Sequence, residues 1–493
     1  MIFNSVDYLI FFPAVTLIYF MLPRKAGNIW LLAASFAFYM NWNAGYGLLL
    51  FSSIVITYTA ARLMGKCGEK KKARSVMVLS LVLNLGMLAY FKYFGFFADN
   101  INMLLSKIGQ KGLQAPDILL PVGISFYIFQ AVGYTLDVYH GRITPEKNFF
   151  TYALFVSFFP QLVAGPIERS TNLLPQFREK HSFDAARIRE GLMIMLWGLF
   201  IKMVIADRIA LMITPVFDEY LVYSGMEIFF ACVLFSIQIY CDFAGYSHIA
   251  IGSAKVLGFT LMDNFRQPLS SVSVHDFWNR WHISLTGWFR DYLYIPLGGN
   301  RKGMVRKQIN RILVFLVSGL WHGAAWHYVI WGGLNGCYLM AEDLIPGKKE
   351  AAGKAGEQSP DVVVGRVSRR VLTFFLVSFA FLFFRAASLK EAIGMLRQCK
   401  ADPGIRLFLS RGVGRLFASA GMDAACAAAF LLAVLLLIGV DFFGRNGYRP
   451  TAYLVSLKAP LRWIAYTALV FYILIFGIYG KDFPQTEFIY FQF

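Results

Sequence analysis

The residue of this 493-residue chain that is best placed for chemistry is a histidine in a long apolar run. His322 follows residues 312–321, in which Ser318 is the one polar side chain. Ten helical residues span about 15 Å, half of the hydrocarbon core of a bilayer, and ionisable residues at that depth are expensive and typical of functional sites. Desolvation disfavours a charged imidazole, so we expect a neutral general base acting on a hydroxyl or thiol. That chemistry suits acyl transfer from a thioester.

A second polar concentration occupies residues 273–301. Within residues 275–291, two histidines (His275 and His282), two arginines and two aspartates alternate with tryptophan and phenylalanine at three- and four-residue spacings. Two interpretations stay open. The segment is either an amphipathic helix that anchors the chain at the headgroup level, or the polar rim of a cavity.

Other kinds of catalytic site have little support. His322 and His327 are five residues apart, which is not the spacing of two ligands on one helical face, and no glutamate lies nearby to complete a metal site. We therefore predict no metal. The sequence has no GxSxG motif and its six cysteines form no CxxC pair. A hydrogen bond between helices is the second interpretation of His322, and His327 is expected to be structural.

The composition is that of a membrane protein. Hydrophobic residues make up 57% of the chain and charged residues 15%, against about 25% charged in soluble domains. The mean hydropathy is +0.54. These values exclude a soluble enzyme and a disordered chain. The formal charge of +18 is expected to lie in cytoplasmic loops beside anionic lipid, so we predict a lipid partner and no nucleic acid.

Apolar runs predict an all-α, polytopic bundle of about 11 crossings in one integral-membrane domain, 1–493. The runs are 6–22, 28–42, 46–63, 75–97, 118–138, 191–206, 226–243, 309–320 continuing through 325–341, 371–384, 424–440 and 461–479. Two further runs, 149–163 and 244–262, are interrupted and are predicted to be re-entrant or interfacial. Broken backbone at membrane depth has to be covered by protein or line a cavity, so we expect a tunnel or funnel.

Basic loops predict the orientation. Residues 62–74 form the densest short basic loop and should be cytoplasmic, which places the N-terminus outside. We also assign 264–311 as a cytoplasmic amphipathic block and 342–370 as a flexible cytoplasmic loop.

The two polar blocks, DFWNRWHISLTGWFRDYLYIPLGGNR at 276–301 and LVSGLWHGAAWHYVIWGGLNG at 316–336, resemble the signature segments of the membrane-bound O-acyltransferase family. The most similar branch is that of bacterial alginate and polysaccharide O-acetylation. Further segments match in family order, at 119–141, 155–169, 237–259 and 488–493. The resemblance therefore covers nearly the whole chain.

The resemblance implies a helical bundle around a tunnel, with His322 matching the catalytic histidine and His282 a second, supporting one. It implies a bacterial inner or plasma membrane location, an acetyl-CoA or other acyl thioester donor from the cytoplasm, and no permanently bound cofactor. It also implies an SGNH-type or related extracytoplasmic acetyltransferase partner. Arg290, Asp291 and Trp281 are candidates for the donor side; for Arg290, a contact with donor phosphate and an ion pair with Asp291 both stay open.

Two departures from the family pattern concern the donor side. Asn279 stands where the family often has arginine, and His275 where a small polar residue is common. Acetyl is favoured over D-alanyl, because the D-alanyl transferring relatives are generally shorter chains. Two functions of a different class also stay open: a carrier or flippase for an acylated or anionic lipid, with His322 as a proton relay, and a membrane scaffold for a secreted enzyme.

Overall fold

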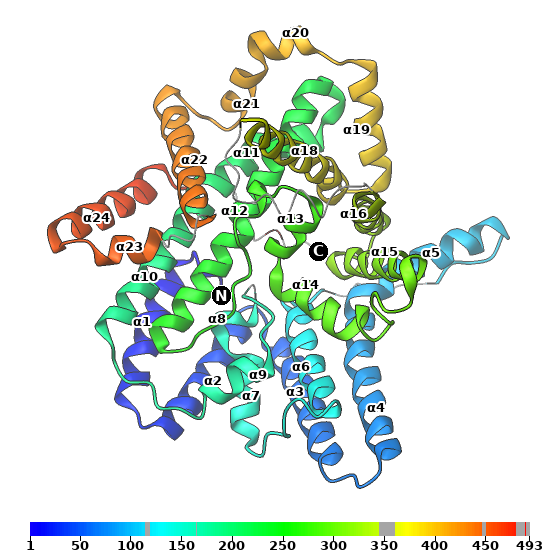
Figure 1. The fold of residues 1–493 in the computed structure, drawn as a ribbon, viewed down its shortest axis with the longest axis vertical. Coiled ribbons are helices and arrows are strands. Elements are labelled where there is room, and N and C mark those ends of the chain that lie inside the picture. Colours follow the sequence, from blue (N-terminus) through cyan, green and yellow to red (C-terminus); the bar gives the residue numbers. More distant parts are fainter. Residues whose placement is uncertain (114–118, 164, 345–359, 446–449, 480–488, 490–493) are drawn as a thin grey trace. The chain divides into compact units, whose positions relative to one another are not determined.

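The computed structural model describes residues 1–113, 119–163, 165–344, 360–445, 450–479 and 489, and their regular structure is helical throughout (Figure 1). Helices suit a bilayer because they satisfy their backbone hydrogen bonds internally. Six helical segments among these residues are long and apolar enough to cross a membrane. They are Ala44–Met64, Lys70–Lys107, Gly225–Leu257, Val364–Arg385, Ala424–Arg445 and Ala459–Phe476. The all-helical membrane class is thus confirmed, whereas the eleven crossings stay a prediction.

The described chain divides into two compact units. Unit 1 comprises Met1–Met195 and Tyr246–Asp263, and unit 2 comprises Leu196–Gly245 and Asn264–Phe493. Two helices, α10 (Ala185–Phe200) and α12 (Gly225–Leu257), continue from one unit into the other. The organisation of residues 1–493 as a single integral-membrane domain stays a prediction.

Unit 1 is built around a buried helix, α6 (Ile124–Tyr139), which packs against α3 and α4. Nearly all α6 side chains are buried, as expected for a helix that is apolar on most faces. Asparagine side chains cap α3 and α7 by accepting backbone N–H groups of the first turn. The helices of this unit besides α6 and α10 are α1 (Val6–Met21), α2 (Arg24–Met40), α3 (Ala44–Met64), α4 (Lys70–Leu88), α5 (Phe94–Lys107), α7 (Phe149–Ser157), α8 (Phe159–Leu162) and α9 (Ser170–Gln176).

The two interrupted runs have different outcomes. Residues 149–163 break at Phe158 between α7 and α8, as the interruption of the run indicated. Their re-entrant or interfacial placement stays a prediction. The interruption predicted at 244–262 is wrong, because α12 continues unbroken to Leu257. The interruption was predicted from Ser247, His248 and Lys255, but all three lie within α12, and Lys255 pairs with Glu190. Local polarity in the sequence therefore did not break the helix.

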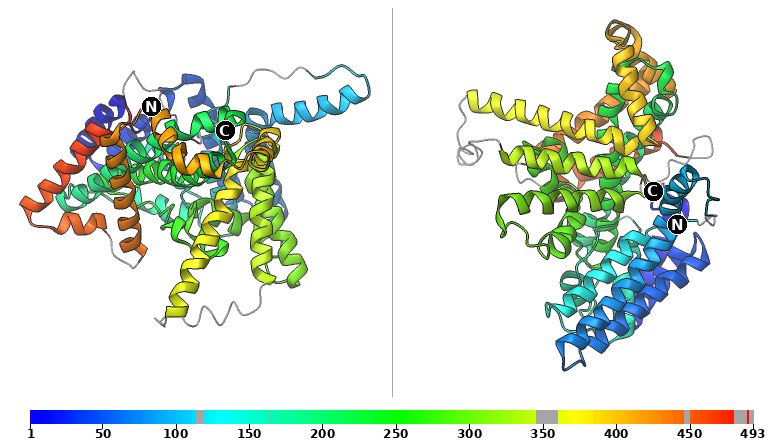
Figure 2. Two further views of the ribbon diagram at one scale, coloured as in Figure 1. Left: turned by 90° about the horizontal axis from the view of Figure 1, so that it is seen from above. Right: turned by 90° about the vertical axis from the view of Figure 1, so that its right-hand side faces the viewer.

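Unit 2 contains the remaining helices, three of which, α15, α16 and α18, lie side by side (Figure 2). The helices of this unit besides α12 are α11 (Asp207–Asp218), α13 (Val274–Arg280), α14 (Ile283–Phe289), α15 (Gly303–His322), α16 (Trp326–Leu344), α18 (Pro360–Arg385), α19 (Leu389–Ala401), α20 (Ile405–Leu407), α21 (Val413–Ser419), α22 (Ala424–Arg445), α23 (Pro450–Ser456) and α24 (Ala459–Phe476). The exposed apolar side chains of α22 and α24 suit contact with lipid.

The predicted flexible loop at 342–370 is helical at both of its ends. Residues 342–344 end α16, and residues 360–370 begin α18. Residues 345–359 lie outside the described part of the chain, so this portion of the loop stays a prediction. The cytoplasmic block predicted at 264–311 contains α13, α14 and the start of α15.

Candidate active site

The two histidines singled out in the sequence lie together in unit 2. The ring centroids of His282 and His322 are 6.2 Å apart, at an interplanar angle of 57°. Their side chains are almost completely buried, with 1% and 2% of the residue surface exposed. The polar block at 273–301 and the apolar run before His322 therefore contribute to one site.

His322 is positioned by a tight helical hairpin. It is the last residue of α15, and Gly323 follows in extended conformation before α16 begins at Trp326. The sequence had suggested a continuous apolar crossing through 341, but the chain turns back here. The reversal is close because the glycines have no side chain. A Cβ on Gly319 would collide with the Tyr328 carbonyl oxygen, and one on Gly332 with that of Phe315.

His282 is positioned by a break in the backbone. It separates α13 from α14 and adopts the left-handed conformation, with φ 43° and ψ 53°. Non-glycine residues adopt this conformation at a cost and are frequent at functional sites. The next two residues hold the turn, because Ile283 N–H donates to the Asn264 carbonyl at 3.0 Å and Ser284 Oγ donates to Asn264 Oδ1 at 2.9 Å.

Aromatic rings enclose both imidazoles. Phe243 meets His282 edge to face at 4.7 Å between centroids. Trp321, Trp331 and Phe384 surround His322 at 5.0, 4.9 and 5.4 Å. Burial lowers the pKa of His282, which lies outside the candidate membrane spans, to about 3. Its imidazole is therefore neutral at pH 7 and can accept a proton or donate a hydrogen bond.

Five of the seven aromatic side chains of the 273–301 block are buried, whereas Tyr292 and Tyr294 are partly exposed. Phe277, Trp278, Trp281, Trp288 and Phe289 are all buried in the protein, whereas the rings of a headgroup anchor would lie on its surface. The block is also not one helix, since it divides at His282. Of the two interpretations left open, the structure favours a segment that lines an interior site.

The predicted donor-side residues differ in how far their side chains are buried. Arg290 Nε lies 2.8 Å from Asp291 Oδ1, and the Arg290 side chain is 65% exposed. This is the ion pair left open as one of its two interpretations. Trp281 is buried and stacks on Phe277 at 5.3 Å, so it packs in the core beside His282. His327 Nδ1 lies 2.9 Å from the Phe383 carbonyl oxygen, which agrees with a structural role.

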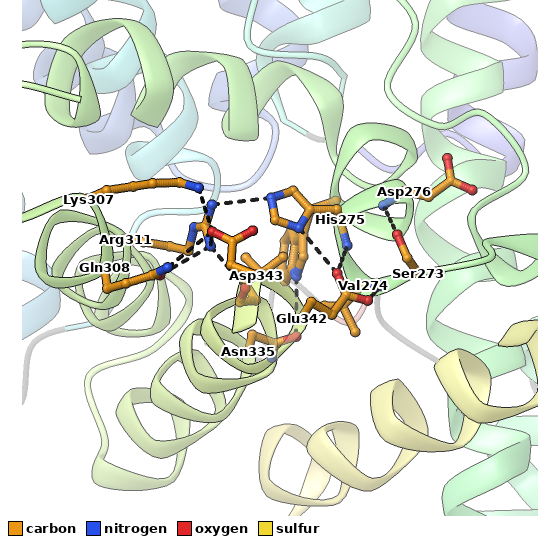
Figure 3. A network of polar contacts seen from close by, with 12 residues as sticks. Ser273, Val274, His275, Asp276, Lys307, Gln308, Arg311, Asn335, Glu342 and Asp343 are labelled. Carbon is orange, nitrogen blue, oxygen red and sulfur yellow. Dashed lines mark hydrogen bonds and ion pairs between the residues drawn. The ribbon is translucent and has the colours of Figure 1, made fainter. Parts of the chain in front are cut away.

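A polar network joins α13 to the α15–α16 hairpin (Figure 3). His275 Nδ1 lies 3.2 Å from Glu342 Oε2, and its Nε2 lies 3.3 Å from Arg311 Nη2. Arg311 Nη1 also donates to Asp343 Oδ2 at 2.8 Å. Since α13 leads directly to His282 and α15 ends at His322, the network ties together the two segments that carry the histidines.

Asp343 is the acceptor at which this network converges. Burial would raise its pKa, but hydrogen bonds from Lys307, Gln308 and Arg311 outweigh burial and hold the pKa well below its ordinary value. Arg311, Glu342 and Asp343 were not among the site residues predicted from the sequence. The signal available was an arginine within the helix before His322 and two carboxylates at the end of the next apolar run.

A buried charge cluster that includes Asp242, the neighbour of Phe243 in the chain, was also not predicted. Lys202 Nζ lies 2.7 Å from Asp207 Oδ1 and 2.5 Å from Asp242 Oδ1, and all three side chains are at most 3% exposed. Asp242 precedes Phe243, which contacts His282, and its Oδ2 accepts the backbone N–H of Ile489 at 2.9 Å. Lys202 and Asp242 stand within predicted crossings, where a charge is itself a functional signal.

Among the described residues, no group of three or more His, Cys, Asp and Glu side chains could hold a metal ion. An apolar pocket of about 310 Å³ is lined by α12, α18, α19 and the residues around Pro403, and neither His282 nor His322 is in its lining. The tunnel at the histidines stays a prediction.

Comparison with known proteins decides the family. Residues 144–347 match the model of the membrane-bound O-acyltransferase family. The chain is 37% identical to the probable alginate O-acetylase AlgI of Azotobacter vinelandii, over 80% of this chain and 76% of that protein. The chain belongs to the membrane-bound O-acyltransferase family. It is also 32% identical to the peptidoglycan O-acetyltransferase of Helicobacter pylori, over 100% of this chain and 98% of the other.

This membrane-bound O-acyltransferase is more distant from the D-alanyl branch. It is 26% identical to the teichoic acid D-alanyltransferase of Bacillus subtilis, over 53% of this chain and 68% of that protein. The family and these relatives make the chain an acyltransferase and a multi-pass protein of a bacterial cell membrane. The family match includes His282, His322 and the network around Arg311.

Proposed function

We propose that this membrane-bound O-acyltransferase moves an acetyl group from a cytoplasmic thioester across the membrane for O-acetylation of an extracellular or periplasmic polysaccharide, with His322 as general base. The relatives named for alginate and peptidoglycan O-acetylation support an envelope polymer as the final acceptor. The single observation that carries the catalytic assignment is the buried pair of His282 and His322 within one aromatic enclosure.

The proposed step needs a base in a dry site. The oxygen of an acceptor hydroxyl attacks the thioester carbonyl carbon, so that a C–O bond forms as the C–S bond breaks. His322 removes the hydroxyl proton and returns it to the departing thiolate, and no net proton is gained or lost. Positioned general bases contribute about 10²- to 10⁴-fold to such reactions, and water exclusion protects the thioester from hydrolysis.

His282 is proposed to position the acyl donor. Its neutral ring lies beside His322 and is held by the strained turn between α13 and α14, which fixes its orientation. Arg290, Asp291 and Trp281 belong to the donor side in this proposal. The donor is acetyl-CoA or another acyl thioester that binds as a substrate, and no permanently bound cofactor or metal takes part.

The proposal includes a path through the bilayer and an external partner. We propose about 11 crossings that enclose a tunnel, so that donor and acceptor approach the histidines from opposite faces. An SGNH-type or related extracytoplasmic acetyltransferase then receives the acetyl group and esterifies the polymer. The short helices and breaks around His282 and His322 support such a cavity, since irregular backbone in a membrane has to line one or be covered.

The test is acetyl transfer by the purified protein in proteoliposomes, with labelled acetyl-CoA supplied on one side and a hydroxyl acceptor on the other. We expect His322→Ala and His322→Gln to lose at least 100-fold in rate, while His140→Ala, at an exposed histidine, keeps it. Thermal unfolding shows whether the variants are folded. Full activity of a folded His322→Ala protein would refute the catalytic assignment.

The teichoic acid D-alanyltransferases among the relatives support D-alanyl as a second acyl group. A parallel assay with a D-alanyl thioester separates the two by the label that reaches the acceptor. Movement of labelled lipid without formation of a new ester would instead indicate a carrier. Polymer acetylation in cells that contain the His322→Ala protein would indicate a scaffold.

A further inference from the structure

Four arginines from three separate helices gather in unit 2. Arg280 ends α13, Arg366 and Arg370 stand near the start of α18, and Arg445 ends α22. Arg370 and Arg445 each interact electrostatically with the other arginines of this group and with Asp276. We call the four residues the arginine cluster.

Backbone packing brings these helices together. Helix α18 contacts both α13 and the turn Pro268–Ser270 that precedes it. Near the end of α22, a Cβ on Gly444 would lie 2.8 Å from Gln267 Nε2, which shows how closely α22 approaches the same turn. The cluster is therefore part of the packed structure of this unit.

The α18 arginines face the cluster. Arg366 and Arg370 are four residues apart, hence on one helical face, and both are partly buried, whereas Arg369 is exposed. The Arg370 Nε atom is buried and has no hydrogen-bond partner among the described residues. An inward-facing guanidinium whose Nε–H has no partner among these residues can donate a hydrogen bond to a bound ligand.

Asp276 offsets only part of the positive charge. Its Oδ1 lies 2.6 Å from Arg280 Nε, and its Oδ2 accepts the Val272 N–H at 3.2 Å. Its carboxylate points away from the His275 network (Figure 3). Asp276 is the carboxylate whose attraction opposes the repulsion among the arginines at Arg370 and Arg445. Since arginine keeps its charge, partly buried guanidinium groups that repel one another favour a bound anion.

We propose that the arginine cluster binds a ligand that carries two or more phosphate groups. The planar N–H fork of arginine matches phosphate oxygens in pairs, and several such forks hold several phosphates. Two sources share this chemistry: the phosphate-bearing end of a soluble thioester donor, and an anionic lipid headgroup. We assign the site to the donor, because Arg280 is two residues before His282 in the chain. This assignment rests on the proposed function.

The chain offers a matched set of variants. Arg370→Gln and Arg445→Gln remove inward-facing charges from two different helices, and Arg369→Gln removes one exposed charge beside Arg370. The probes are coenzyme A and adenosine 3′,5′-bisphosphate, added to the protein in nanodiscs of zwitterionic lipid. We expect each cluster variant to weaken binding about tenfold or more and Arg369→Gln to change it less than twofold. The tenfold loss should shrink at high salt.

Unchanged binding in both cluster variants, or equal weakening in all three, would overturn the proposal, with thermal unfolding as the check on folding. A second arm replaces the zwitterionic lipid by phosphatidylglycerol. If Arg370→Gln weakens association with that lipid and leaves coenzyme A binding unchanged, the donor assignment is overturned in favour of a lipid headgroup. Binding to His322→Ala separates this proposal from the catalytic one, because that variant should bind coenzyme A normally while losing acetyl transfer.

Discussion

The glycine contact between α15 and α16 offers the sharpest test of how His322 is positioned. Gly332 lies against the backbone of α15, where its missing side chain leaves no space for a methyl group. An added Cβ would collide with the Phe315 carbonyl oxygen and lie 3.2 Å from the Gly319 Cα. Its neighbour Gly333 is a matched control, because a Cβ there would meet only the Leu316 Cδ2 atom, at 3.4 Å.

The magnitude follows from these two contacts. Restoring ordinary van der Waals separation at Gly332 requires the helices to move apart by about 1 Å. Overpacking of this kind costs about 1–3 kcal/mol, while alanine gains about 1 kcal/mol of helix propensity over glycine in both variants. We expect Gly332→Ala to be less stable than Gly333→Ala by about 1–3 kcal/mol. A misplacement of about 1 Å at His322 should cost about 100-fold in transfer rate.

The assay compares initial rates of acetyl transfer in proteoliposomes for the two variants, together with thermal unfolding. The prediction is a large loss of rate for Gly332→Ala at temperatures where it remains folded, and a rate near that of the unchanged protein for Gly333→Ala. Equal rates for the two variants would refute the reasoning, since the hairpin contact would then not set the position of His322.

Two predictions concern pH. Hydrogen bonds from cationic and amide donors outweigh burial and lower the pKa of Asp343, so its contribution to stability is present above the ordinary aspartate pKa and is lost as pH falls through the lowered value. Asp343→Asn should therefore cost about 2 kcal/mol of stability at pH 7. The variant should also lack this acid-dependent loss of stability, as measured by thermal unfolding against pH. Burial raises the pKa of Glu168 to about 7, so its protonated form is favoured in the folded state and stability should fall as pH rises from the ordinary glutamate pKa to about 7. Glu168→Gln should abolish that fall, and an unchanged pH profile would contradict it.

Local features of the sequence were sufficient for some of these conclusions. His322 was identified because a single ionisable residue after an apolar run is conspicuous, and His282 because its block resembles a family signature. The same local signals misled at 244–262, where Lys255 pairs with Glu190 and α12 continues. They also missed Arg311 and Asp343, whose importance depends on partners from a neighbouring helix.

The sequence by itself determined the membrane environment and the family: so few charges among so many apolar residues require a bilayer, and the residues of the two polar blocks resemble the signature segments of the membrane-bound O-acyltransferases. Only the tertiary structure decided that His282 and His322 share one aromatic enclosure and that four arginines converge beside Asp276. Hydropathy and sequence motifs are properties of neighbouring residues along the chain. The meeting of distant side chains depends instead on the left-handed turn at His282 and on the glycine contacts that close the α15–α16 hairpin.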